Sequence, residues 1–187
     1  MIQFTRFSNK ETQMINDSEK IFEFLKNAAK HAFLKLKRNH GNEISGFALY
    51  SDSGAMSVQA LGNSLSNLKR YIEEDGDDVE YYKWSVGEWD ITIEQNKFFE
   101  FINSALATEP PQISEAGFND YRNTIFNACV NALSQLKTEG LFKETISEFC
   151  LVFSASDYEN PEEEIQWISL LNEESKAREF SEWLNSF

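Results

Sequence analysis

The sequence predicts an α+β domain with a mainly antiparallel sheet of about four or more strands and helices packed on one face. Three observations lead to this class: two short apolar runs joined by a turn, several long stretches with helical spacing, and one very apolar strand late in the chain. Hairpins mixed with long helices are typical of α+β folds. With 187 residues, 41% of them hydrophobic, the chain can bury a core, so we expect one domain over residues 1–187.

The first half of the chain predicts a helix followed by a hairpin. Apolar residues recur at steps of three or four between positions 17 and 38, which indicates a long amphipathic helix. The runs 44–50 and 56–61 flank a Ser-Asp-Ser-Gly turn and predict two antiparallel strands. A short helix over 65–72 and then a solvated acidic loop are expected next.

The second half alternates strands and helices. In order, we expect a strand over 81–86, a helix that begins at Asp90 or Thr92, a long helix over 114–138, a strand over 149–155 and a terminal helix that carries Phe180, Trp183 and Leu184. The strand over 149–155 (FCLVFSA) is the most apolar run. It is therefore predicted to be the central strand.

The charge of the chain is strongly negative and uneven. The formal net charge is −14, from 17 Lys plus Arg against 31 Asp plus Glu. Residues 1–40 hold 8 basic and 4 acidic side chains, whereas residues 73–94 hold 9 acids and 1 base and residues 157–182 hold 9 acids and 2 bases. Nucleic-acid backbones and anionic membranes both attract basic surfaces, so we expect neither as a partner.

The location expected for the chain is the cytoplasm. No stretch approaches the apolar length of a membrane span, and the first residues lack the apolar core of a signal peptide. The two cysteines, Cys129 and Cys150, do not suggest a secreted disulfide framework. Both lie in apolar patterns, where cysteine serves as a small hydrophobic residue.

Motifs for chemistry are absent from the sequence. There is no zinc-ligand spacing, phosphate-binding glycine loop, dinucleotide fingerprint or nucleophile elbow, so we expect no metal, no cofactor and no enzymatic activity. One alternative stays open, because Glu88 and Asp90 flank Trp89 and two carboxylates can serve a hydrolase. The alternative to a catalytic pair is structural: the segment forms a turn at the end of a strand, and Asp90 caps the following helix.

Aromatic residues gather beside the first acidic segment. Aromatics in such a cluster belong either to the core or to a binding surface, where Trp and Tyr anchor partners. Acidic side chains around such anchors would suit a basic protein. The candidate partner-binding residues are Glu73, Glu74, Asp77, Asp78, Tyr81, Tyr82, Trp84, Glu88, Trp89 and Trp167.

A series of short motifs resembles a known family. FALYSD at 47–52, GNS at 62–64, WSVGEW at 84–89, LKTEGLF at 136–142 and SLLN at 169–172 occur in an order that resembles the bacterial domain of unknown function DUF4303. The resemblance covers roughly residues 17–185. It implies no catalytic residues, and it implies a kinship with small acidic proteins encoded beside polymorphic toxins, where immunity proteins are common.

The function expected from these observations is binding of a basic protein, and the specific version is immunity to a bacterial toxin. An acidic surface can mimic the phosphate that a nuclease toxin holds, and opposite potentials accelerate association. Two alternatives remain: an enzyme with an unfamiliar carboxylate site, and a homo-oligomeric structural protein that buries aromatic residues at a two-fold contact.

Overall fold

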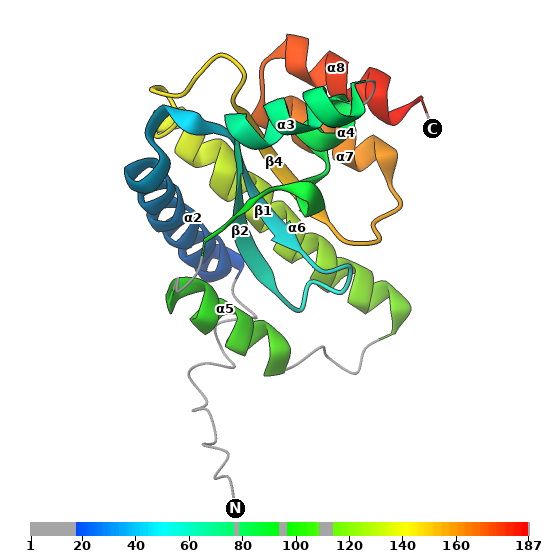
Figure 1. Ribbon diagram of the computed structural model, residues 1–187. Coiled ribbons are helices and arrows are strands. Elements are labelled where there is room, and N and C mark those ends of the chain that lie inside the picture. The colour runs from blue at the N-terminus through cyan, green and yellow to red at the C-terminus, as the bar shows by residue number, and fades with distance from the viewer. Residues whose placement is uncertain (1–17, 77–78, 94–96, 109–113, 187) are drawn as a thin grey trace, which may run out of the picture.

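The computed structural model describes residues 18–76, 79–93, 97–108 and 114–186, and these form an α+β fold around one four-stranded sheet (Figure 1). The predicted fold class is therefore confirmed. The strand order is β3-β2-β1-β4. The strands are β1 (Ile44–Ser51), β2 (Val58–Ser64), β3 (Ile91–Thr92) and β4 (Cys150–Ala155).

The sheet is mixed, not purely antiparallel. The predicted hairpin is present, since β1 pairs antiparallel with β2. Strand β3 pairs with the other edge of β2 and is also antiparallel to it. The chain then returns to the other side of β1, where β4 runs parallel to β1 from Gly46↔Cys150 to Ser51↔Ala155. The expected central position of β4 is wrong, because β4 lies at the edge of the sheet.

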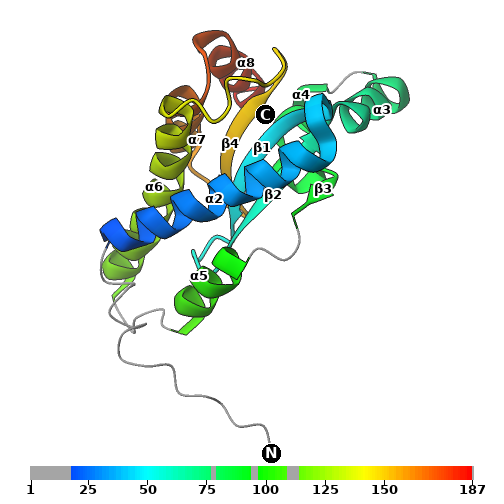
Figure 2. The ribbon, with the colours of Figure 1, turned by 90° about the vertical axis from the view of Figure 1, so that its left-hand side faces the viewer.

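One face of the sheet supports the larger core. Helices α2 (Ser18–His40), α5 (Lys97–Thr108) and α6 (Glu115–Thr138) cover this face (Figure 2). Side chains at alternate strand positions point toward them, as the two-residue period of a strand requires. The buried strand residues of this core are Ile44, Phe47, Leu49, Val58, Ala60, Leu151, Phe153 and Ala155.

The opposite face is also covered by helices, although we expected helices on one face only. The covering elements are α4 (Val79–Trp84), the 3-10 turn η2 (Val86–Glu88), α7 (Pro161–Leu171) and α8 (Glu174–Leu184). Two strand residues on this face are small, Ala48 and Cys150, and they share a buried cluster with Leu61, Val152 and the rings of Trp84, Trp89 and Phe180. Small strand residues leave the space that large aromatic rings fill.

The C-terminal region forms two helices, α7 and α8, where one terminal helix was expected.

The connections on either side of the hairpin are short helices, and two elements expected after them differ from the prediction. Helix α3 (Leu65–Asp75) follows β2, and the 3-10 turn η1 (Gly41–Glu43) joins α2 to β1. Residues 81–86 form the end of α4 and the start of η2, so the predicted strand is wrong. The predicted start of the following helix is also wrong, since Ile91–Thr92 pair with β2 and α5 begins at Lys97.

Tertiary contacts explain why the aromatic run at 81–86 is not a strand. Aromatic residues favour strands only weakly, and that preference depends on packing. In α4, Trp84 packs edge-on against Phe180 with ring centroids 5.2 Å apart, and its indole Nε1 donates to Glu179 Oε1 at 3.1 Å. A single helical turn places Trp84 there while it leaves Tyr81 half-exposed.

Across the part of the chain that the structure describes, no helix is both long and apolar enough to cross a membrane.

Candidate functional site

The motifs that first suggested the family mostly occupy structural positions. In the FALYSD motif, Asp52 organises the hairpin turn: its Oδ1 accepts the N–H groups of Gly54 at 2.9 Å and Met56 at 3.1 Å, and its Oδ2 accepts the Ser57 hydroxyl at 2.7 Å. Partial burial works to raise the pKa of Asp52, but these hydrogen bonds outweigh it and lower that pKa. Asp52 therefore holds the turn as a carboxylate.

The motifs at 62–64 and 84–90 meet in one polar junction. Asp90 accepts the Ser64 N–H at 2.9 Å and the Ser64 hydroxyl at 2.7 Å, while Ser64 Oγ accepts the N–H of Asn67 at the start of α3. The side-chain amide of Asn67 donates to Asn63 Oδ1 and to the Glu88 carbonyl. These bonds join β2, α3 and η2, so the sequence motifs mark a joint between elements.

The two carboxylates of the possible catalytic pair lie in different settings. Both oxygens of Asp90 accept from Ser64, the N-cap residue of α3, so the prediction that Asp90 caps the following helix is wrong. Glu88 Oε1 accepts the hydroxyl of Tyr81 at 3.3 Å. Neither carboxylate bonds to the other.

The three candidate tryptophans lie in the interior. Trp84, Trp89 and Trp167 are 3%, 7% and 5% exposed. The six-membered ring of Trp89 lies close against Gly46 of β1, and Trp167 packs against the rings of Phe126 and Phe153. In this conformation these rings stabilise the two cores and offer no surface to a partner.

The candidate tyrosines lie at the surface between α3 and α4. Tyr71 and Tyr82 stack with ring centroids 3.5 Å apart and planes 7° apart, and Tyr81 meets Tyr82 edge-on at 5.1 Å. The guanidinium of Arg70 lies 4.0 Å from the Tyr71 ring and forms an ion pair with Glu74 at 3.2 Å. The stack therefore holds half-exposed aromatic rings beside acidic side chains.

The two acid-rich segments of the sequence come together in space. Lys83 of α4 forms an ion pair with Glu179 of α8 at 2.6 Å, and the Trp84–Phe180 contact joins the same helices. Figure 1 shows α3, α4 and α8 at the same end of the molecule, and Figure 2 shows α3 across that end from α7 and α8, with α4 between them. We call the exposed carboxylates there, with the tyrosine stack, the acidic surface: Glu73, Glu74, Glu80, Glu174, Glu182, Tyr71, Tyr81 and Tyr82. The candidates Asp77 and Asp78 lie outside the described residues.

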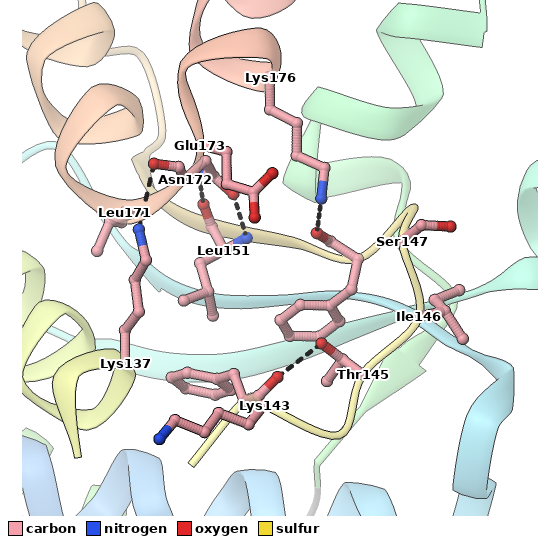
Figure 3. Close-up of a pocket in the computed structure, with 12 residues that line it drawn as sticks. Lys137, Lys143, Thr145, Ile146, Ser147, Leu151, Leu171, Asn172, Glu173 and Lys176 are labelled. Carbon is pink, nitrogen blue, oxygen red and sulfur yellow. Dashed lines mark hydrogen bonds between the residues drawn. The ribbon is translucent and has the colours of Figure 1, made fainter. Parts of the chain in front are cut away.

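A pocket that the sequence did not reveal lies at the other side of α8. It measures about 520 Å³ and opens between the end of α6, the segment 141–149, β4 and the α7–α8 turn (Figure 3). Its lining residues are Lys137, Phe142, Lys143, Thr145, Ile146, Ser147, Phe149, Leu151, Leu171, Asn172, Glu173 and Lys176. The lysines are scattered along the sequence, so no spacing signalled them. The available signal was the motif pair 136–142 and 169–172, which meet at this pocket.

Asn172, the last residue of the SLLN motif, closes the free edge of β4. Its Oδ1 accepts the Leu151 N–H at 2.9 Å, and its Nδ2 donates to the Leu151 carbonyl at 2.7 Å. The side-chain amide thus replaces the neighbouring strand that an edge strand lacks. It also fixes the α7–α8 turn against the sheet.

Comparisons with known proteins agree with this distribution of motifs. No curated protein and no solved structure matches the chain. A family model described as a domain of unknown function, DUF4303, matches residues 25–173. The match runs from α2 to the α7–α8 turn, and it includes the hairpin, the polar junction and the edge closure by Asn172. The chain therefore belongs to the DUF4303 family.

Proposed function

We propose that this chain is a cytoplasmic bacterial protein that binds a basic protein through the acidic surface, and that its specific role is immunity to a toxin. The observation that carries the proposal is the contact of α4 with α8, through the ion pair of Lys83 and Glu179. It brings together segments 73–94 and 157–182, which are far apart in sequence and hold most of the excess acid.

The chemistry of this surface suits lysine and arginine side chains. Exposed carboxylates accept charge-assisted hydrogen bonds from both, and arginine also stacks on aromatic faces such as Tyr82. A net charge of −14 would accelerate the approach of a basic partner. Because Glu73 and Glu80 are exposed, such pairs would form at the rim of an interface, where salt screens them.

The test is co-purification with the protein encoded by the adjacent gene, followed by affinity measurement by calorimetry. We expect binding to weaken as NaCl rises from about 0.05 M to 0.5 M. We also expect the variant Glu73→Lys/Glu74→Lys to lose roughly tenfold or more in affinity. If no neighbour binds, or if binding ignores salt, the proposal is wrong.

A matched control separates the surface from the net charge. The variant Glu43→Lys/Asp120→Lys makes the same charge change at exposed positions in η1 and α6. It should bind nearly as well as the unmodified protein. An equal loss in both variants would show a general charge effect, and no loss in the first variant would move the interface to residues 157–182.

A further inference from the structure

The pocket beside β4 combines an apolar floor with a cationic rim. Phe142, Phe149, Leu151 and Leu171 are buried and form the floor, whereas Lys137 reaches it from α6 and Lys176 reaches it from α8. Figure 3 shows these two lysines on different sides of the pocket. Its volume of about 520 Å³ lies within the range of small-molecule sites.

The two lysines of the rim donate to backbone carbonyl groups in a chain that is rich in acids. Lys137 donates to the Asn172 carbonyl at 3.1 Å, and Lys176 donates to the Phe149 carbonyl at 2.6 Å. Among the described residues, no carboxylate lies within 4.0 Å of either ammonium group, although Lys26, Arg70 and Lys83 all form such pairs. An ammonium has three donors, so each lysine keeps hydrogen-bonding capacity for a ligand.

Electrostatics around Lys137 favour a bound anion. Burial lowers the pKa of Lys137, and the charge of Lys176 acts in the same direction, while Glu173 opposes them without cancelling them. Of the two nearby charges, Glu173 affects the pKa of Lys137 more than Lys176 does, so burial is the main cost of the ammonium charge, and a bound anion would offset that cost. The pocket is lined by three lysines, Lys137, Lys143 and Lys176, and by one carboxylate, Glu173, so its lining carries a net positive charge that attracts an anion.

The hydroxyl and amide side chains that line the pocket are already hydrogen-bonded within the protein. The Thr145 hydroxyl donates to the Phe142 carbonyl at 2.7 Å, and Ser147 donates to Glu148 at 2.8 Å. The side-chain amide of Asn172 is hydrogen-bonded to the backbone of Leu151. Recognition therefore falls to the ammonium groups and to the apolar floor.

We propose that this pocket binds a small organic carboxylate with an apolar body, with the carboxylate between Lys137 and Lys176 and the body against Phe142 and Phe149. The site is separate from the acidic surface and does not depend on its function. A ligand there would contact the α7–α8 turn through Asn172 and Glu173.

Titration of the full chain with phenylacetate tests the site. ¹H–¹⁵N correlation spectra recorded at each step monitor the binding. Shifts are expected for amides in 141–149 and 172–176. The neutral isostere phenylacetamide should bind roughly tenfold or more weakly, because it keeps the ring and loses the charge. Equal binding of the two compounds, or no shifts with phenylacetate, would overturn the proposal. Displacement of phenylacetate by equimolar inorganic phosphate would also overturn the proposal, because it would show that the site recognises charge without the apolar body.

Substitutions then assign the binding to the lysines. Lys137→Gln and Lys176→Gln can each keep a donor and lose the charge, and each should weaken phenylacetate binding by roughly tenfold. Lys26→Gln, on α2 and away from the pocket, is the matched control and should not change the affinity. Unchanged affinity in both pocket variants, with native spectra retained, would contradict the assignment; so would an equal loss in the control.

Discussion

At the scale of single residues, the close approach of Trp89 to β1 depends on a missing side chain. A Cβ at Gly46 would lie 2.8 Å from the Trp89 ring, which is closer than real contacts allow. Trp89 is buried among rigid neighbours, so the ring cannot move aside cheaply. Gly46, just before the FALYSD motif, and Trp89, the last residue of the WSVGEW motif, are thus the two sides of one contact.

We predict that Gly46→Ala lowers the free energy of unfolding by roughly 1–3 kcal/mol, through overpacking against Trp89. Urea denaturation followed by tryptophan fluorescence measures this change. Gly87→Ala is the matched control, since a Cβ there meets nothing within 4 Å, and its effect should stay within about 0.5 kcal/mol. Equal stability of the two variants would show that Trp89 does not require the glycine.

At the scale of elements, α7 begins with three consecutive glutamates that differ in burial. Asn160 caps the helix by accepting the Glu163 N–H, and the first-turn acids favour the positive end of the helix dipole. Glu162 is exposed, but Glu164 is largely buried, and burial raises its pKa from 4.5 to about 7. The packing of α7 on the sheet therefore places one carboxyl group where its charge is costly.

This arrangement gives the protein a pH-dependent stability. The native state holds a proton on Glu164 that the unfolded chain releases, so Glu164 makes the protein less stable as pH rises from about 4.5 to about 7. We predict that Glu164→Gln raises stability by roughly 1–2 kcal/mol at pH near 8, after allowance for solvent screening, and changes it little near pH 4.5. Thermal melts at both pH values measure the effect.

Glu162→Gln is the control for this prediction, because it removes an exposed charge from the same helical turn. It should not stabilise the protein at pH near 8. A gain of equal size in both variants would assign the effect to net charge, and no gain in Glu164→Gln would mean that the carboxyl group is well solvated.

At the scale of the whole molecule, the sheet separates charge as well as cores. Helix α2 carries six basic side chains on one face of the sheet, whereas the two acid-rich segments lie with α4, α7 and α8 on the other. Such a separation orients the molecule in the field of a charged partner. It also means that the net charge of −14 understates the local potential at the acidic surface.

The two cysteines report on whether the two cores unfold together. Cys129 lies in the larger core and Cys150 in the smaller one, and both are buried and free. Burial raises the pKa of both thiols, that of Cys150 to about 12, so neither supplies a reactive thiolate at neutral pH. Their reaction with a thiol reagent therefore requires opening of the structure.

We predict that both thiols are unreactive in the native protein and become reactive over the same range of urea concentration, because every central strand contributes to both cores. Mass spectrometry after pulse labelling measures each cysteine separately. Labelling of Cys150 at clearly lower urea would show that the smaller core opens by itself, against the expectation of one domain over residues 1–187.

The long periodic helices and the hairpin were predictable from the sequence, whereas the structure of the aromatic run at 81–86 was not. The helices expected over 17–38 and 114–138 match α2 and α6 closely, since a long apolar stripe outweighs other local preferences. The run 81–86 looked like a strand because its rings favour sheets. Its helix forms because Trp84 finds Phe180 nearly a hundred residues later.

The sequence by itself determined the α+β class, the hairpin, the long helices, the uneven charge and, through its ordered motifs, the family. These properties are local or additive, so neighbouring residues and simple counts contain them. Only the tertiary structure decided that β4 is an edge strand closed by Asn172, that three candidate tryptophans are interior, and that Lys137 and Lys176 share a pocket. These outcomes depend on contacts between distant segments, and a pattern of apolar and charged residues does not specify which distant surfaces meet.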